Sequence, residues 1–214
     1  WGFRTLDLLV DRRVLIPRPE TEVVAGLALA ALEALGRPGL AVDLGTGSGA
    51  VALSLAAERW PHVEVWATDS SADALAVARA NLAGLGRRAA VVRLAEGDWF
   101  GALPAELQGR VDVLVSNPPY VAARDPLPPE VADWEPLAAL VPGPTGLEAI
   151  ERIVAGAPAW LAPTGTLVLE IGETQGGAVL ALAGAAGFTS ARVHPDLAGR
   201  DRALVATGPA TAKI

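Results

Sequence analysis

Two consecutive prolines beside an asparagine give this chain its clearest candidate for chemistry on a planar NH2 group. The segment reads Asn117-Pro118-Pro119-Tyr120 and directly follows the apolar run of residues 111–115. Each proline fixes φ near about −65° and lacks a backbone N–H, so the carbonyl oxygens have no competing donor. The Asn117 side chain can accept or donate a hydrogen bond. The segment predicts a binding site for an amide or amino nitrogen, although a Pro-Pro turn that merely closes a strand has the same sequence.

A second candidate site is the glycine-rich segment Asp43-Leu44-Gly45-Thr46-Gly47-Ser48-Gly49. An apolar run precedes it and the helical pattern of residues 50–58 follows it, which indicates a strand, a turn and the start of a helix. Glycines permit positive φ and the close approach of a ligand, while the first turn of a helix presents free N–H groups. This pattern predicts a site for a nucleoside-containing cofactor.

The identity of that cofactor stays open on these residues alone. Gly45, Gly47 and Ala50 also satisfy the spacing G-x-G-x-x-G/A of dinucleotide-binding loops, so nicotinamide and adenosyl cofactors both fit. Residues 63–67 predict a second strand that ends near Asp69, 24 residues after Gly45. The Asp69 carboxylate could accept both ribose hydroxyl protons, which supports a nucleoside of either kind.

Apolar runs of strand length alternate with helical runs from residue 40 onward. Strands are expected at residues 40–44, 63–68, 90–94, 111–115 and 166–171, and helices at residues 20–35, 50–58, 72–82, 147–161 and 176–186. Such alternation indicates parallel strands joined by crossover helices. The sequence therefore predicts an α/β fold in which both candidate segments follow strands.

Hairpins are expected near both ends of the chain. Residues 5–10 and 14–16 predict a small hairpin, and residues 190–193 and 203–207 predict an antiparallel pair that completes the sheet. Residues 122–145, rich in proline and acidic residues, are too long for a plain connection. Because they lie at the carboxyl end of a predicted strand, we expect them to be functional.

Composition narrows the classes of protein that fit. The chain has 214 residues, 51% of them hydrophobic, which suffices for one domain with a sizeable core. Its net charge of −7 argues against direct binding of nucleic acid, which needs clustered Lys and Arg. Cysteine is absent, which excludes disulfides and suits a cytoplasmic protein. No apolar stretch reaches the roughly 20 residues of a membrane span.

Few other residues suggest a site. His62 and His194 are far apart in sequence, and we expect neither a metal ion nor a histidine base. Acids at a helix start or in a polar loop have ordinary explanations, although they can also be read as an acid–base set. These acids are Glu20, Glu22, Glu130, Asp133 and Glu135. For Glu170, which follows an apolar strand, a place near the cofactor and a structural hydrogen bond fit the sequence equally.

With these segments in view, the chain resembles the release-factor glutamine N5-methyltransferases, which use S-adenosylmethionine to methylate the glutamine of a Gly-Gly-Gln motif in peptide chain release factors. The resemblance spans nearly all of residues 1–207. Asn-Pro-Pro-Tyr alone is shared with other amino and amide methyltransferases, so it indicates the reaction class only. The segment Pro17-Arg18-Pro19-Glu20-Thr21-Glu22 narrows the resemblance to the glutamine enzymes. The resemblance is also carried by residues 43–49, Gly97-Asp98-Trp99-Phe100, residues 116–120, and Glu170-Ile171-Gly172 with Gln175.

The resemblance implies a Rossmann-like S-adenosylmethionine-dependent methyltransferase fold, with a seven-stranded, mostly parallel sheet and a C-terminal antiparallel strand. The family also has an N-terminal helical domain that helps to bind the release factor. The chain begins at Trp1 and contains no methionine, so we expect residues 1–19 to be a β-hairpin and linker that lead from such a domain. Residues 20–208 are expected to form the methyltransferase domain, and residues 209–214 a tail.

The resemblance further implies roles for individual residues. The cofactor would be bound by Gly45, Thr46, Gly47, Gly49, Asp69, Asp98, Trp99 and Asn117. Within this set, Asp69 would hold the ribose, and Asp98 and Trp99 would flank the adenine. The alternative for Trp99 and Phe100 is core packing.

The substrate glutamine would be bound by Asn117, Pro118, Pro119 and Tyr120, of which Asn117, Pro118 and Tyr120 would form the catalytic group. The Asn117 side-chain oxygen and the Pro118 carbonyl would each accept one amide hydrogen and direct the nitrogen toward the methyl group. This arrangement requires no strong general base, and Tyr120 would pack beside the glutamine or the cofactor.

Four other functions stay open on sequence alone. The nearest is a ribosomal-protein glutamine methyltransferase. An amino-group methyltransferase acting on nucleic acid is disfavoured by the negative charge and by the lack of a visible target-recognition domain. A nicotinamide-dependent oxidoreductase would have no use for Asn-Pro-Pro-Tyr, and a nucleoside-binding module would bind cofactor without turnover.

Overall fold

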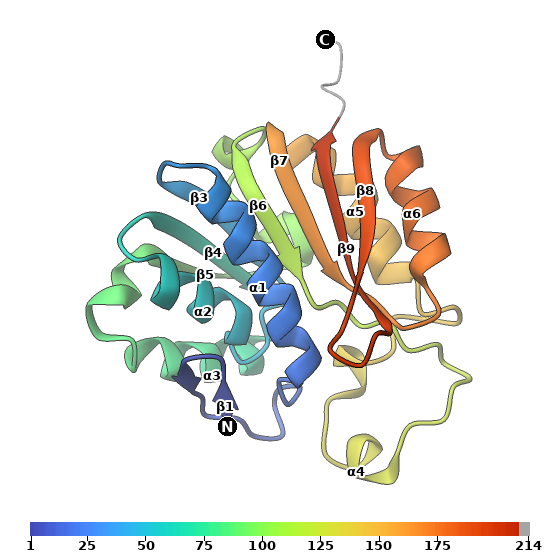
Figure 1. Ribbon diagram of the computed structural model, residues 1–214. Coiled ribbons are helices and arrows are strands. Elements are labelled where there is room, and N and C mark those ends of the chain that lie inside the picture. Colours follow the sequence, from blue (N-terminus) through green and yellow to red (C-terminus); the bar gives the residue numbers. More distant parts are fainter. Residues whose placement is uncertain (210–214) are drawn as a thin grey trace.

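A seven-stranded sheet runs through the middle of the molecule, with helices on both of its faces (Figure 1). The computed structural model describes residues 1–209. The strand order is β5-β4-β3-β6-β7-β9-β8. The strands are β3 (Gly39–Leu44), β4 (Val63–Asp69), β5 (Val92–Glu96), β6 (Val111–Ser116), β7 (Leu161–Glu170), β8 (Phe188–Pro195) and β9 (Asp201–Pro209). All pairs among β3 to β7 are parallel, and β9 is antiparallel to β7 and β8, which confirms the predicted fold class.

The central strands are apolar on both sides because each face of the sheet is covered. Successive residues of β6 belong to different cores: Val113 and Val115 to one, and Leu114 between them to the other. Helices α1 (Pro19–Ala34) and α2 (Ala50–Arg59) pack in the first core, and α5 (Glu148–Trp160) and α6 (Gly176–Ala185) in the second. Continuous apolar runs such as β6 are typical of parallel strands buried on both faces. Among the described helices, none has the length and apolar character to cross a membrane.

The order of the strands creates a point at the carboxyl ends of β3 and β6 where the loops that follow these two neighbouring strands turn to opposite sides. From β3 the chain moves to β4 and β5 on one side, by way of α2 and α3 (Ala72–Ala83), and then returns to place β6 on the other side of β3. Leu44 pairs with Ser116 at the carboxyl ends of β3 and β6. Ligands of open parallel sheets bind at such switch points. The glycine-rich segment and Asn-Pro-Pro-Tyr therefore begin side by side.

The N-terminal hairpin exists, and the strand expected at residues 5–10 contains one of its two strands, but the strand expected at residues 14–16 was wrong. It consists of β1 (Gly2–Phe3) and β2 (Leu6–Asp7), and residues 14–16 form no strand. Asp11 instead accepts hydrogen bonds from the backbone and side chain of Arg13, which close a local turn. Val14 is then buried against Ala74 and Val77 of α3. Burial against a helix thus replaced the expected strand pairing.

Other boundaries differ by a few residues from the prediction. The strand expected at residues 90–94 begins at Val92, because Gly86–Val91 forms a 3₁₀ helix. The helix expected to reach Leu161 ends at Trp160, and Leu161 starts β7 by pairing with Val111. The antiparallel pair at the C-terminus is confirmed as β8 and β9. Of the predicted tail, residues 210–214 lie outside the described residues.

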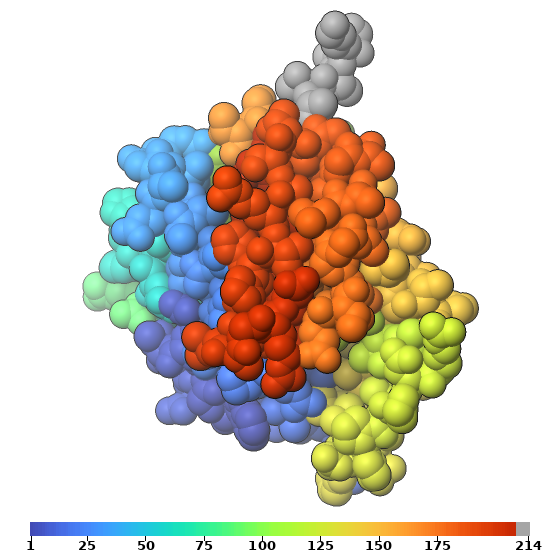
Figure 2. All heavy atoms as spheres, turned by 45° about the vertical axis from the view of Figure 1, so that its right-hand side comes forward, coloured from blue at the N-terminus to red at the C-terminus, as the bar shows by residue number. Residues whose placement is uncertain are grey.

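Residues 122–145, here called the long loop, project from the sheet edge where the carboxyl ends of the strands lie (Figures 1 and 2). They contain the single turn α4 (Pro129–Ala132) and a 3₁₀ helix at Leu137–Ala139. Ala122 and Gly143 form a bridge that closes the base of the loop. The loop thus leaves the sheet and returns to it next to Asn-Pro-Pro-Tyr.

Candidate active site

The glycine-rich segment is a tight turn between β3 and α2. The backbone N–H groups of Gly45 and Thr46 both donate to the Thr68 carbonyl, at 2.9 and 2.8 Å, which ties the turn to β4. Gly45 has φ +72°, and Gly49, which precedes α2, has φ +87°. A Cβ at Gly49 would lie 3.0 Å from the Leu53 side chain. Positive φ and close packing explain why glycine is needed at these positions.

Asp43, at the end of β3, holds this turn from inside. Its side chain is 1% exposed, and its Oδ2 atom accepts hydrogen bonds from the Thr46 hydroxyl at 2.7 Å and the Ala52 N–H at 3.1 Å. Burial raises the pKa of Asp43 to about 6, against the opposing effect of these two bonds. The sequence prediction did not assign Asp43 a role of its own, although an acid that ends a buried strand was a visible signal.

Asp69 ends β4 and links the turn to the following helix. Its Oδ2 atom accepts the Gly47 N–H and its Oδ1 atom accepts the Ser71 N–H, both at 2.9 Å. Each carboxylate oxygen can accept a further bond, because an ionised carboxylate offers about four acceptor positions in total. Asp69 and Ser70 face the same cavity as Gly47. A ligand with hydroxyl groups can therefore bind at this acid.

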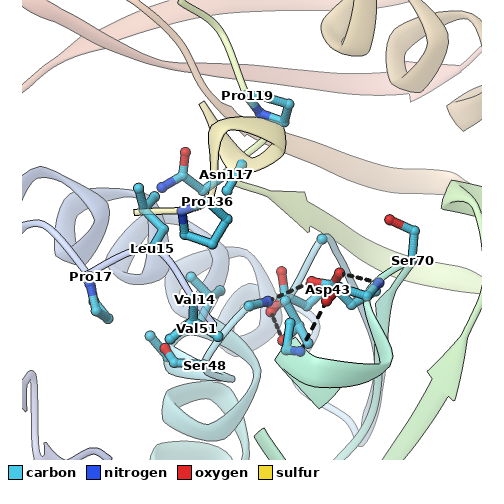
Figure 3. A pocket seen from close by; sticks show the side chains of 18 of the residues that line it. Val14, Leu15, Pro17, Asp43, Ser48, Val51, Ser70, Asn117, Pro119 and Pro136 are labelled. Atoms are coloured by element: carbon cyan, nitrogen blue, oxygen red, sulfur yellow. Dashed lines mark hydrogen bonds between the residues drawn. The ribbon is translucent and has the colours of Figure 1, made fainter. Parts of the chain in front are cut away.

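A cavity of about 230 Å³ opens at the switch point between β3 and β6. Its walls come from residues 12–18, here called the N-terminal arm, and from the glycine turn, the end of β4, Asn-Pro-Pro-Tyr and the long loop. Figure 3 shows Leu15, Asn117 and Pro136 grouped together, apart from Asp43 and Ser70. The lining includes Leu15, Thr21, Gly45, Thr46, Gly47, Asp69, Trp99, Asn117, Pro119 and Pro136. Segments far apart in the sequence thus converge on one concave site, as expected for a bound small molecule.

Trp99 and Asp98 lie differently with respect to this cavity. Trp99 lines it, has φ +47°, and stands 3.5 Å from the position that a Cβ of Gly45 would take. Asp98 is not among the lining residues, because its carboxylate points to solvent and pairs with Arg152 at 2.5 Å. Phe100 stacks on Trp160 with ring centroids 5.8 Å apart. Both rings are half-buried and pack against the second core, and Trp99 also lines the cavity whereas Phe100 does not.

Asn-Pro-Pro-Tyr leaves β6 at Ser116, whose hydroxyl donates to the Leu44 carbonyl at 2.6 Å. The Asn117 Nδ2 atom donates to the Thr21 hydroxyl at 3.2 Å. Among the described residues none donates to the Asn117 Oδ1 atom, so this oxygen can accept a bond from a ligand. The segment thus presents a hydrogen-bond acceptor at the cavity, which a site for an NH2 group requires.

A second, smaller cavity of about 60 Å³ adjoins the first. Both cavities are lined by Leu15, Asn117, Pro119 and Ala139. The smaller one is also lined by Arg18, Pro118, Tyr120, Val121, Leu140 and Glu170. Asn117 and Pro119 therefore stand where two binding spaces meet, which is the arrangement needed when a group passes from one ligand to another.

Two buried polar residues, Thr21 and Glu170, and the half-buried Tyr120 support this junction. The Thr21 hydroxyl donates to the Glu170 Oε2 atom at 2.7 Å, and the Tyr120 hydroxyl donates to Oε1 at 3.2 Å. Burial raises the pKa of Glu170 to about 7 and the pKa of Tyr120 above its ordinary value. Of these residues, Thr21 was missing from the predicted site and Glu170 had no assigned role.

The N-terminal arm and the long loop close the site from outside. Glu135, 8% exposed, pairs with Arg18 and accepts the backbone N–H of Ile16 at 3.4 Å. Arg12 stacks over the Trp134 ring at 4.0 Å. Pro136, next in the chain, lines the larger cavity. Glu135 therefore anchors the long loop to residues 16–18.

Most predicted site residues come together, and two do not. Six of the predicted cofactor residues line the larger cavity: Gly45, Thr46, Gly47, Asp69, Trp99 and Asn117. The four predicted substrate residues, Asn117, Pro118, Pro119 and Tyr120, line the smaller one. Gly49 and Asp98 line neither. Within residues 1–209, no three His, Asp or Glu side chains are grouped as metal ligands.

Comparison with known proteins places the chain in a family. Residues 24–128 match the model of the methyltransferase small domain. A release factor glutamine methyltransferase of Xylella fastidiosa is 46% identical over 209 residues, which cover 97% of this chain and 74% of the relative. One from Cereibacter sphaeroides is 49% identical over 212 residues, covering 98% and 71%.

Solved structures agree with the fold. A methyltransferase from Pyrococcus furiosus superposes with a TM-score of 0.67 at 20% identity, over 96% of this chain and 90% of that one. At this identity the likeness bears on the fold alone. The relatives of high identity over nearly the whole chain go further and confirm the resemblance found in the sequence. The chain belongs to the family of release factor glutamine methyltransferases.

Proposed function

We propose that this protein transfers a methyl group from S-adenosylmethionine to the side-chain amide nitrogen of the Gly-Gly-Gln glutamine in a peptide chain release factor, and thereby modulates translation termination in the cytoplasm. The observation that carries the proposal is the junction of two cavities at Asn117 and Pro119. The names of the close relatives support the substrate.

The larger cavity suits S-adenosylmethionine. The glycine turn leaves open space beside Gly47, where an added Cβ would meet no atom within 4 Å. Asp69 offers carboxylate oxygens for ribose hydroxyls, and Trp99 offers an aromatic wall for adenine. When bound, the cofactor supplies a sulfonium methyl group, which the glutamine nitrogen takes as the sulfur–carbon bond breaks and one N–H proton leaves to water.

The smaller cavity suits the glutamine side chain. An amide nitrogen is a poor nucleophile because its lone pair is delocalised into the carbonyl group, so its orientation must be fixed. The Asn117 Oδ1 atom and the Pro118 carbonyl would each accept one amide hydrogen, and positioning of this kind contributes up to about 7–11 kcal/mol. The same acceptors stabilise the positive charge that develops on nitrogen. Tyr120 stays neutral, because burial raises the pKa of its hydroxyl, and it packs beside the substrate.

The proposal makes a prediction about the acceptor atom. A purified release factor incubated with the protein and S-adenosylmethionine should gain one methyl group, located by tandem mass spectrometry on the Gly-Gly-Gln glutamine. A release factor with that glutamine replaced by glutamate is the matched control and should gain none. Methylation of a ribosomal protein or a nucleic acid, but not of a release factor, would contradict the proposal.

A further inference from the structure

The side-chain amide of Asn117 works only in one of its two orientations. If the carboxamide were turned by 180°, its NH2 group would face the NH2 group of the substrate, and two donors would meet. Asn117 lies after β6 and packs beside α1, so its own backbone does not choose between these orientations. Something else in the structure has to fix the amide.

Thr21, in the first turn of α1, is the residue that faces the Asn117 amide. Its hydroxyl oxygen accepts the Asn117 Nδ2 hydrogen at 3.2 Å. A hydroxyl group has one hydrogen, and that hydrogen is directed to the Glu170 Oε2 atom at 2.7 Å. Only lone pairs of Thr21 then remain for Asn117. With its hydrogen committed, Thr21 can receive the NH2 end of the amide but not the oxygen end.

Glu170, at the end of β7, keeps the Thr21 hydroxyl in this direction. Its other oxygen accepts the Tyr120 hydroxyl at 3.2 Å, so both carboxylate oxygens are occupied by donors. Thr21 is 3% exposed and Glu170 is 1% exposed, which keeps water from competing for these bonds. The positive charge of the buried Arg202 favours the ionised form of Glu170, whereas the negative charge of Glu20 disfavours it. The carboxylate is thus an acceptor for two hydroxyls.

From this chain of donors and acceptors we infer that Thr21 and Glu170 are positioning residues that hold the Asn117 carboxamide with its oxygen toward the substrate NH2 group. The inference rests on the proposed function, in which Asn117 accepts a hydrogen from the glutamine amide. Three segments meet here: Thr21 is 96 residues from Asn117 and 149 residues from Glu170. These hydrogen bonds therefore form only when α1 is packed against the sheet.

Substitutions at Thr21 separate this role from simple packing. Valine has the shape of threonine without the hydroxyl, so Thr21→Val should lower kcat for release factor methylation about tenfold, the effect of one lost hydrogen bond. Affinity for S-adenosylmethionine, measured by calorimetry, should change less than about twofold. Thr21→Ser keeps the hydroxyl and should restore most of kcat. Thr189→Val, which removes an exposed hydroxyl on β8, is the matched control.

A double-mutant cycle tests whether Thr21 acts through Asn117. In a protein that already carries Asn117→Ala, Thr21→Val should lower kcat no further, because the amide that it positions is gone. The inference would be overturned if Thr21→Val lowered kcat equally in the native protein and in Asn117→Ala. It would also be overturned if Thr21→Ser were as slow as Thr21→Val, or if Thr21→Val had an unchanged kcat. If the native protein does not methylate the release factor, that result would instead contradict the proposed function.

An NMR measurement needs no substrate, and it distinguishes a failure of this inference from a failure of the proposed function. The chain has only two asparagines, Asn81 and Asn117, so selective ¹⁵N labelling gives two side-chain amide signals. The Asn81 amide is held by the Leu9 and Ser48 carbonyls and serves as an internal reference. In Thr21→Val the Asn117 Nδ2 protons should shift and exchange faster with water while those of Asn81 do not change. Unchanged Asn117 signals would overturn the inference whatever the substrate.

Discussion

Replacing Glu170 by glutamine should change how the stability of the protein depends on pH. The carboxyl group is buried beneath α1 and beside Asn-Pro-Pro-Tyr. Burial raises its pKa from 4.5 to about 7, although the hydrogen bonds from Thr21 and Tyr120 and the charge of Arg202 oppose the rise. The folded protein therefore holds a proton at pH values where the unfolded chain has already released it.

The sign of the effect follows from this difference in proton binding. The contribution of Glu170 to the free energy of unfolding is fully present below about pH 4.5 and is lost as the pH rises through about 7. At about 1.4 kcal/mol per pKa unit, the loss between about pH 5 and pH 8 is about 3 kcal/mol. Glutamine cannot ionise and should not show this loss.

Urea unfolding of the native protein and Glu170→Gln at both pH values measures the effect. The difference in free energy of unfolding between the two proteins should shift by about 3 kcal/mol in favour of the variant from about pH 5 to pH 8. Asp43, whose pKa is also raised, is present in both proteins and cancels. Glu106→Gln, at an exposed residue, is the control and should follow the native protein.

The same variant should be slower in methylation, because glutamine presents an NH2 group to hydroxyls that need acceptors. A buried charge that costs stability and supports activity is typical of a functional site. Parallel pH profiles for native protein and Glu170→Gln would refute the reasoning about burial. Full activity in Glu170→Gln would refute its role in orienting Thr21.

Three further predictions concern the cofactor, the acceptor and the long loop. Asn117→Ala should lower kcat by roughly 10²-fold with nearly unchanged calorimetric affinity for S-adenosylmethionine, and native turnover would exclude its role as acceptor. Asp69→Ala should weaken that affinity about tenfold or more, because two ribose hydrogen bonds are lost, and equal affinity would show that the ribose lies elsewhere. Arg18→Ala leaves Glu135 buried without its cation, so limited proteolysis within residues 122–145 should be about tenfold faster. Arg152→Ala breaks an exposed pair and should not change that rate; equal acceleration by both variants would contradict the anchoring role of Glu135.

The fold could largely be predicted because its central strands β3 and β6 are short, mostly apolar runs. All residues of β6 are buried, and the chain around them alternates between strand and helix. The second strand of the N-terminal hairpin was placed wrongly at residues 14–16, because Val14 looks like a strand residue but packs against α3. Local patterns show that a side chain is apolar, but they do not show what it packs against.

The site was predicted where its residues are neighbours in the chain, and missed where they meet only in the fold. The glycine turn and Asn-Pro-Pro-Tyr are contiguous, and most of their residues line the two cavities. Thr21 and Glu170 are 149 residues apart, and no local pattern joins them. The resemblance placed both Asp98 and Trp99 at the cofactor, but Trp99 has φ +47° and starts a 3₁₀ helix, and the Asp98 carboxylate pairs with Arg152 outside the cavity.

Mass spectrometry of a release factor after incubation with this protein and S-adenosylmethionine tests the proposed function most directly. The native protein should add one methyl group to the Gly-Gly-Gln glutamine, and Asn117→Ala should add at most a trace under the same conditions. An unmodified release factor, with S-adenosylmethionine binding confirmed by calorimetry, would contradict the assigned substrate. Equal methylation by Asn117→Ala would contradict the assigned acceptor.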